Sequence, residues 1–318
     1  MGLRFPFHDG SNPAGIRKGA EVMQPFRIRR LSRVAGGTSM GFQGQIGYKS
    51  QVNSAAQTDA QNRRRSLVET DLLLAEEIIA RPELPPRGVT TKRQLAITFA
   101  GAFEFQVGRS TSWVDPSRLL FADADQPFVD HHVVPGTGHK SVILTPDENI
   151  LDEVWGSAKA EFARRIRACS LRVQMLAQLM RRTSNAFAAE EIGIELLGES
   201  VADRRPVTTV DPRCVRKAKA VLHECVEGRL TLTEVAADVG VSPIHLTQTF
   251  KRSEGMPLYR YQTGLRLSRA LDKLPEREDI SDLAFELGFS SHSHFTSVFR
   301  ENVGVTPSSY RSAAVALS

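Results

Sequence analysis

The sequence has few cysteines and no long apolar stretch. None of its 318 residues lies in anything approaching the run of about 18 apolar residues that a transmembrane helix needs, so we expect no membrane partner. Its three cysteines, Cys169, Cys214 and Cys225, form no CxxC pair, which argues against a zinc site or a disulfide framework. No secretory signal, with its apolar core of about 7–15 residues, is recognised. We therefore expect a cytoplasmic protein.

The arrangements typical of enzymes are missing as well. We find no nucleophile–base pattern, no glycine-rich phosphate loop and no paired catalytic carboxylates. Residues 36–41 contain several glycines but lack the flanking strand and helix of a dinucleotide site. The sequence predicts a protein that is not an enzyme and has no cofactor.

Charge is unevenly distributed along the chain. The 41 Lys and Arg residues exceed the 36 Asp and Glu residues, and the net charge of +5 suggests a nucleic-acid partner. Residues 1–66 carry a net charge of +8, residues 67–206 carry −4 and residues 207–318 carry +1. The basic character therefore belongs to the first segment, and net charge alone does not locate a DNA-binding domain.

Residues 1–66 show neither helical nor strand periodicity. They are rich in Gly, Ser, Gln and Asn, and arginines supply most of their charge. We predict a basic, disordered tail. An arm that contacts DNA phosphates is the alternative interpretation.

Residues 67–150 are predicted to form β structure. Leu95, Ile97 and Phe99 alternate with polar or small neighbours, which is the pattern of a half-buried strand, and the alternation resumes at Phe103. Frequent proline and glycine turns separate the short strands. This spacing favours a sandwich or a small barrel.

The pattern then changes to a helical period. Apolar residues recur near helical spacing between Ile166 and Met180, which predicts one or two amphipathic helices within residues 150–200. These helices are expected to cover the barrel or to pair with a second subunit. Residues 201–210 are polar and are predicted to be a linker.

The C-terminal part contains two similar blocks. The first block runs from Leu232 to Ser242 and the second from Ile280 to Ser290, at an offset of 48 residues. Beyond the turn the offset is 49, so that Phe250 aligns with Phe299. A slip of one residue after a turn preserves the helical register on either side of it.

Each block has the local signals of a helix–turn–helix. Thr231 with Glu234 forms a capping box that opens the first helix, and Asp279 caps the equivalent helix of the second block. Gly240 and Gly288 end these helices, at a position where a positive φ favours glycine.

A second helix follows each turn. Ser242 and Pro243 are the N-cap and the first helical residue in one block, and Ser290 or Ser291 is the N-cap in the other. A connecting helix is predicted from Pro257 to about Leu274, and it spans roughly 27 Å. Two recognition helices at that separation fit successive major-groove segments, which lie about 34 Å apart.

Three further stretches complete the pattern: Gly288–Arg300, Gly304–Arg311 and the connector Leu265–Ala270. With the repeated blocks, they make residues 213–312 resemble the C-terminal DNA-binding domain of the AraC/XylS family of bacterial transcription regulators. Residues 67–155 resemble the cupin-like sensor half of such regulators.

The resemblance implies an α+β protein with two folded domains. The first, residues 67–200, is expected to be a cupin-like β-barrel with trailing helices after about residue 150. The second, residues 211–318, is expected to be an all-α domain in which a long helix joins two helix–turn–helix motifs.

The family's geometry places base contacts on the exposed face of each second helix. Gln248 suits bidentate contact with adenine, and Ile244 suits packing on a thymine methyl group. Many relatives carry arginine at the positions of Gln248 or Ser297, so the commonest guanine contact is absent here. The predicted base-reading residues are Pro243, Ile244, Thr247, Gln248, His292, Ser293, Thr296 and Ser297. The predicted phosphate contacts are His245, Lys251, Arg252, Arg266, Arg300 and Ser308, together with helix N-terminal amides.

The sensor half is expected to hold a small-molecule effector rather than a metal. Aromatic residues are predicted to line the pocket, with an ordinary core as the alternative; they are Phe99, Phe103, Phe105, Trp113, Phe121 and Phe128. His131, His132 and His139 lie close together, near Asp130 and Glu104. However, adjacent histidines in a strand point to opposite faces, and the HxH spacing of metal cupins is missing. We therefore expect no metal.

The function predicted from the sequence is sequence-specific DNA binding by an effector-responsive transcription activator. The resemblance implies double-stranded promoter DNA, RNA polymerase and a second copy of the chain, as a homodimer, as partners. Two alternatives remain. One is a constitutive or architectural DNA-binding protein whose barrel only dimerises, and the other is a cupin metalloenzyme fused to a DNA-binding module.

Overall fold

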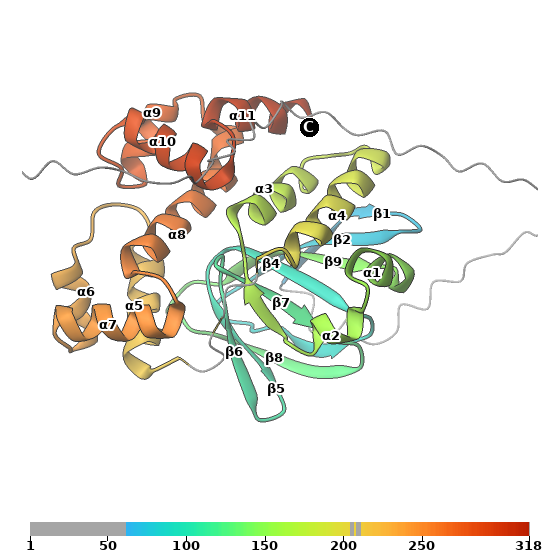
Figure 1. Ribbon diagram of the computed structural model, residues 1–318, viewed down its shortest axis with the longest axis horizontal. Coiled ribbons are helices and arrows are strands. Elements are labelled where there is room, and N and C mark those ends of the chain that lie inside the picture. The colour runs from blue at the N-terminus through green and yellow to red at the C-terminus, as the bar shows by residue number, and fades with distance from the viewer. Residues whose placement is uncertain (1–61, 204–206, 208–210, 318) are drawn as a thin grey trace, which may run out of the picture. The chain divides into compact units, whose positions relative to one another are not determined.

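The computed structural model describes residues 62–203, 207 and 211–317 (Figure 1). Most of the predicted tail lies outside the described residues. For its last residues the prediction of disorder is wrong, because they form a strand. Arg63–Arg65 belong to the edge strand β1 (Arg63–Glu69), which pairs antiparallel with the next strand. Arg64 and Arg65 form ion pairs with Glu76 and Glu77 on that strand, so these basic residues are held by acidic neighbours instead of continuing the tail.

The strands form two antiparallel sheets. The six-stranded sheet has the order β1, β2 (Leu73–Ala80), β9 (His139–Pro146), β4 (Gln94–Ala100), β7 (Arg118–Ala122) and β10 (Ile166–Ala168). The four-stranded sheet has the order β3 (Arg87–Thr90), β8 (Gln126–His132), β5 (Phe103–Val107) and β6 (Ser110–Val114). The predicted α+β class is confirmed. Within the described residues, the strands that were expected to form a barrel make two separate sheets.

Strand β4 explains the layering. Leu95, Ile97 and Phe99 lie in a core shared with helices, whereas Ala96 lies in a second core between the two sheets. Both faces of β4 are therefore buried. The predicted strand is confirmed, but it is fully rather than half buried, because one face is covered by helices and the other by the smaller sheet.

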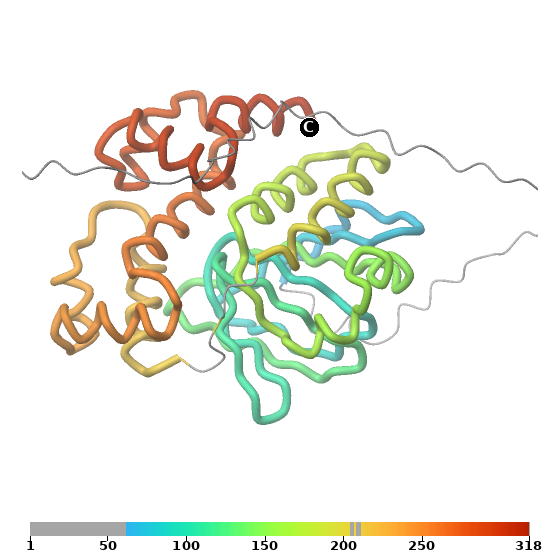
Figure 2. Tube along the Cα trace, viewed as in Figure 1, coloured from blue at the N-terminus to red at the C-terminus, as the bar shows by residue number. Residues whose placement is uncertain are grey.

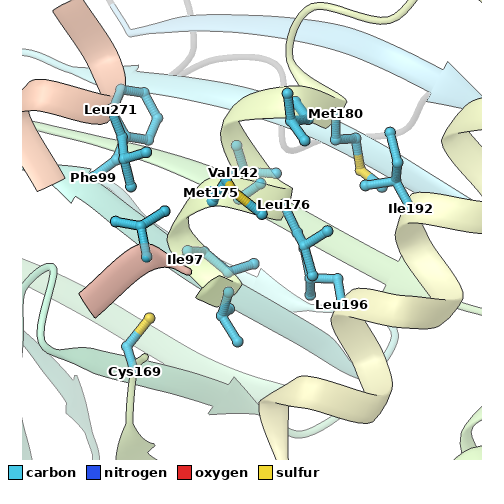
Figure 3. Packing of buried hydrophobic residues seen from close by; sticks show 14 of the residues in the cluster. Ile97, Phe99, Val142, Cys169, Met175, Leu176, Met180, Ile192, Leu196 and Leu271 are labelled. Atoms are coloured by element: carbon cyan, nitrogen blue, oxygen red, sulfur yellow. The ribbon is translucent and has the colours of Figure 1, made fainter. Parts of the chain in front are cut away.

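Four helices follow or interrupt the strands: α1 (Glu148–Trp155), α2 (Ala158–Phe162), α3 (Leu171–Met180) and α4 (Ala186–Ser200). The spacing of Ile166 suggested a helix, but this residue lies in strand β10 and pairs with Leu120 of β7. Met175 and Leu176 of α3 pack towards β4, and Leu196 of α4 packs beside them (Figure 3).

The C-terminal part is helical. Its elements are α5 (Arg213–Glu224), α6 (Leu232–Val239), α7 (Pro243–Glu254), α8 (Leu258–Lys273), the short 3-10 helix η1 (Leu274–Glu276), α9 (Ile280–Glu286), α10 (His292–Val303) and α11 (Pro307–Ala316). Helix α8 is continuous from one helix–turn–helix block to the other (Figure 2). Leu265 packs in the cluster of the first block, and Leu267 and Leu271 pack in a cluster that joins the second block to α3 and β4.

The described residues contain no helix with both the length and the apolar character required to cross a lipid bilayer.

Candidate nucleic-acid interface

The first helix–turn–helix forms as its local signals predict. Thr231 and Glu234 make a reciprocal capping box, in which each side chain accepts a hydrogen bond from the other residue's backbone N–H, at 3.3 and 2.7 Å. Gly240 ends α6 with φ of +81°. The Ser242 hydroxyl accepts a hydrogen bond from the backbone N–H of His245 at 3.2 Å, which starts α7. The turn and both helix starts therefore have local causes.

The second helix–turn–helix repeats this construction. Asp279 accepts hydrogen bonds from the backbone N–H groups of Ser281 and Asp282, which lower the pKa of its carboxyl group. Gly288 has φ of +76°, as predicted for the turn. Ser291, rather than Ser290, caps α10 by accepting a hydrogen bond from the backbone N–H of His294 at 3.1 Å.

Each second helix has one buried face and one exposed face. The buried faces carry the aligned aromatic residues Phe250 and Phe299, which are fully inaccessible and anchor the two helices in separate cores. On the opposite face of α7, Ile244 is 72% exposed, although it is a large aliphatic residue. Apolar side chains are stabilised by removal from water, so this exposed face is suited to contact with a binding partner.

The predicted base-reading residues lie on or beside these exposed faces. Ile244, Gln248, His292, Ser293 and Ser297 are exposed, and Pro243, Thr247 and Thr296 are partly buried. Two of the partly buried residues have committed or inaccessible hydroxyl groups. Thr247 donates to the carbonyl of Pro243 at 2.8 Å, and the Oγ1 of Thr296 is buried without a hydrogen-bond partner among the described residues.

Five of the six predicted phosphate contacts are exposed. His245 lies in the first turn of α7, Lys251 and Arg252 lie in its last turn, Arg300 lies on α10, and Ser308 lies in the first turn of α11. These groups lie on the two recognition helices and on the helix that follows the second one. Their positions are suited to contacts with the phosphates of a DNA backbone that runs past the exposed faces.

Arg266 differs from the other predicted phosphate contacts. Its guanidinium donates to the carbonyl of Gly228 at 2.6 Å and to the carbonyl of Gly288 at 3.4 Å. Burial lowers its pKa. This side chain lies between the two blocks, and its terminal nitrogens donate to backbone carbonyls there, a role that the sequence pattern did not suggest.

A buried charged cluster connects the larger sheet to the first block. Arg118 of β7 forms ion pairs with Glu254 at 2.8 Å and with Asp211 at 3.3 Å, and Lys219 of α5 pairs with the same two carboxylates. Glu254 is the last residue of α7. The recognition helix of the first block is therefore tied to the sheet at its C-terminal end.

A second set of buried polar contacts lies beside this cluster. Asp115 accepts hydrogen bonds from the indole of Trp113 at 2.5 Å and from the hydroxyl of Tyr261 on α8 at 2.7 Å. Burial opposes its ionisation, but His223 and the charge of Lys219 hold the pKa of Asp115 well below its usual range. Neither set could be predicted from the sequence, because partners such as Arg118 and Glu254 lie more than a hundred residues apart.

A cavity of about 370 Å³ lies between the sheets and the helical part. Apolar walls come from Ile79, Phe99 and Leu265, and charged residues at its margin include Lys140 and Glu227. Among the described residues, Lys140 has no ion-pair partner, whereas Glu227 pairs with Arg269 and Lys273. The cavity thus offers apolar surface and the ammonium group of Lys140, which has no acidic partner in the described part of the chain.

The structure does not bring the six predicted pocket aromatics together. Phe99 lines the cavity and also lies in the helix-covered core with Phe121, whereas Phe103, Phe105 and Phe128 pack between the sheets. Trp113 belongs to a small third cluster. For most of these residues, the alternative of an ordinary core describes their surroundings.

The histidines of the sensor half face different partners. His131 contacts Gln106 at the surface, whereas His132 lies 3.3 Å from His139 through ring nitrogens. Burial, and secondarily His132, lower the pKa of His139 to about 3, and burial raises the pKa of the neighbouring Asp130 well above its usual range. No group of three or more potential metal ligands occurs within the described part of the chain.

Comparison with known proteins gives one family match and several similar proteins. A helix–turn–helix domain family matches residues 235–313. The transcriptional activator RhrA of Rhizobium meliloti is 30% identical over 126 residues, which are 39% of this chain and 40% of RhrA. The probable transcription factor PqrA of Proteus vulgaris is 34% identical over 83 residues, which are 26% of this chain and 68% of PqrA.

A solved structure gives a similar match. A transcriptional regulator from Chromobacterium violaceum, described as having an AraC-type DNA-binding domain, is 30% identical, with a TM-score of 0.31. The match covers 32% of this chain and 91% of that chain. This chain thus spans nearly all of that structure but less than half the length of RhrA.

Proposed function

The chain belongs to the AraC/XylS family of transcription regulators, and from this we propose that it binds double-stranded promoter DNA sequence-specifically and regulates transcription. The observation that carries the proposal is the pair of helix–turn–helix blocks whose second helices, α7 and α10, each keep one face exposed. Such a face fits the major groove, where base edges differ in their donors and acceptors. The proposed role requires no catalysis.

Base reading is assigned to the outward side chains of these two helices. Gln248 offers an amide that both donates and accepts, which matches the N6 and N7 groups of adenine, and Ile244 offers an apolar surface for a thymine methyl group. Ser297 and His292 supply hydrogen-bonding groups on α10. The exposed cations Lys251, Arg252 and Arg300 are assigned to phosphates, together with His245 and Ser308.

Replacing Gln248 by Ala is expected to weaken binding to the preferred DNA site by about 1–3 kcal/mol, because a bidentate base contact is lost. Binding to random DNA should remain nearly unchanged, because phosphate contacts supply most non-specific affinity. Titration of both DNAs at one salt concentration measures the two effects. Ser312→Ala, an exposed polar change on α11, serves as the control. An equal loss on both DNAs would contradict the assignment of Gln248 to base reading.

We place the effector in the cavity between the sheets and the helical part. Its lining combines strand residues such as Phe99 with helical residues such as Leu265, so a ligand there touches both parts at once. A ligand shifts an equilibrium only through different contacts with the two states, and such a position supplies them. Lys140 favours a ligand with an apolar body and one negative group.

A thermal-shift screen of small organic anions tests this placement. A binder at about 100 times its Kd should stabilise the protein by about 2.7 kcal/mol and raise its Tm by several degrees. Lys140→Glu should abolish the shift, whereas Lys92→Glu, at an exposed position outside the cavity lining, should keep it. A shift that survives Lys140→Glu would place the ligand elsewhere.

Family membership supports three further parts of the proposal. The protein is proposed to act as a homodimer, to activate transcription through RNA polymerase, and to work in the bacterial cytoplasm, where promoter DNA lies. Sedimentation equilibrium that gives the mass of a single chain would contradict the dimer. In vitro transcription from a bound promoter that is not stimulated by the protein would contradict activation.

A further inference from the structure

The loop before the first helix–turn–helix contacts the second one at a joint, which we define as Gly228, Arg266 and Gly288. Gly228 lies in the loop before α6, and Gly288 lies in the turn before α10. Arg266 lies on α8 between Leu265, which packs in the core of the first block, and Leu267, which packs in the core of the second. The joint therefore sits where the two cores meet.

The guanidinium of Arg266 spans the joint. One terminal nitrogen donates to the carbonyl of Gly228 at 2.6 Å, and the other donates to the carbonyl of Gly288 at 3.4 Å. The backbone N–H of Gly228 in turn donates to the carbonyl of Glu286 at the end of α9, at 3.1 Å. A planar group with several donors in fixed directions holds two carbonyls at a set separation, which a single ammonium group does not do.

Both ends of the joint are anchored. Val226 and Leu230, on either side of Gly228, pack against the core of the first block. Leu287 and Phe289, on either side of Gly288, are buried in the core of the second. A displacement at the joint therefore moves whole blocks rather than loose loops.

The joint leaves no space for adjustment. A Cβ atom added to Gly288 would lie 2.2 Å from the carbonyl oxygen of Gly228, and its φ of +76° disfavours any other residue. Lys273 adds a second link close by, because it pairs with Glu227 of the loop at 2.5 Å and with Glu286 of α9. Helix α8 thus connects the two blocks along the chain, and the contacts of Arg266 and Lys273 connect the loop before α6 directly to the second block.

We propose that this joint fixes the separation of α7 and α10 along DNA, so that Arg266 is a positioning residue that sets the spacing between the two half-sites the protein reads. The inference rests on the proposed DNA-binding function. One inserted base pair moves a half-site by about 3.4 Å along the axis and rotates it by about 36°. A rigid pair of recognition helices loses base contacts in one half-site after such a change, whereas a loosened pair follows it.

The experiment starts from a site selected by the full wild-type chain from a random duplex library. One base pair is then inserted or removed between its half-sites, and the Kd is measured for each spacing at constant salt. The wild-type protein should bind the altered spacings about ten- to a hundredfold more weakly. Arg266→Gln should bind them within about threefold of the original spacing, and its affinity for the original spacing should fall.

The variant Arg266→Lys distinguishes a positioning role of Arg266 from a role as a phosphate contact. Lysine keeps the charge but lacks the fork that bridges two carbonyls, so it should lose spacing discrimination as glutamine does. Arg260→Gln, at an exposed arginine of the same helix, should keep the wild-type discrimination. Urea unfolding of each variant verifies that it is folded, and Arg266→Lys retains the test if the glutamine variant does not fold.

Three outcomes would overturn the inference. Wild-type discrimination in Arg266→Lys would do so, as would a loss that is equal at every spacing with a salt slope reduced by about one, which marks a phosphate contact. A wild-type site with only one half-site would also do so. Failure of the proposed function is distinguishable, because the wild-type chain would then select no sequence at all.

Discussion

Arg118→Met is expected to lower the free energy of unfolding by about 3–5 kcal/mol, because it leaves buried carboxylates without one of their cations. The Arg118 side chain is buried and pairs with Asp211 and Glu254, which are buried as well. Among the described residues, Lys219 then remains as the one cation that pairs with both carboxylates. Urea unfolding of the variant and the wild-type protein measures the difference.

A matched control separates burial from pairing. Arg172 also pairs with two carboxylates, Glu195 and Glu199, but all three side chains are between 26% and 35% exposed. Arg172→Met should therefore cost only about 1 kcal/mol or less. Adding Glu254→Gln to Arg118→Met restores neutrality of the cluster and should recover part of the loss. Equal effects of Arg118→Met and Arg172→Met would contradict the account of the buried cluster.

The charged cluster also connects stability with DNA reading. Glu254 ends the recognition helix α7, and Arg118 belongs to the sheet. In addition, the Ser268 hydroxyl of α8 donates to the carbonyl of Phe99 on β4 at 3.2 Å. These contacts join the sheets to the first helix–turn–helix and to α8, so a change in the sheets would act on the helical part through them.

His139→Gln and Asp130→Asn are expected to change the pH dependence of stability in opposite directions. The folded protein keeps His139 neutral, with a pKa of about 3 against 6.5 when unfolded. Below pH 6.5 the unfolded chain takes up a proton that the folded chain does not, so His139 costs stability as the pH falls. From pH 6.5 to pH 5 this amounts to about 2 kcal/mol, at roughly 1.4 kcal/mol per unit.

Asp130 has the opposite effect on the pH dependence of stability. Burial raises its pKa, so the folded chain binds a proton that the unfolded chain releases above about pH 3.8, and this group favours folding as the pH falls. Relative to the wild-type protein, His139→Gln should therefore gain stability between pH 6.5 and pH 5, and Asp130→Asn should lose it. Urea midpoints across this range measure both trends. Trends of the same sign in the two variants would contradict the lowered pKa of His139 or the raised pKa of Asp130.

The helix–turn–helix blocks were predictable because their causes are local. The Thr231 capping box, the glycine turns and the Ser242–Pro243 start each act within a few residues, and all are confirmed. The connecting helix was predicted from Pro257 to about Leu274 and is observed as Leu258–Lys273.

The tertiary arrangement was less predictable. Nothing near Arg118 in the sequence indicates Glu254 as its partner. Arg266 was predicted to contact a DNA phosphate, whereas its guanidinium donates to the carbonyls of Gly228 and Gly288. The spacing of apolar residues also assigned Ile166 to a helix, which is wrong. Strand β10 has only three residues, and a segment that short shows no periodicity that distinguishes a strand from a helix. These features depend on which segments meet, and that is decided by packing across the whole chain.

The most direct test of the central claim is selection from a random duplex DNA library by the full wild-type chain, followed by footprinting of the enriched sequence. The account predicts one enriched sequence with two half-sites about 10 base pairs apart, protected on the same side of the duplex. It also predicts binding that is at least about 10³-fold tighter than to random DNA. No enrichment, or equal affinity for the selected and the random DNA, would contradict it.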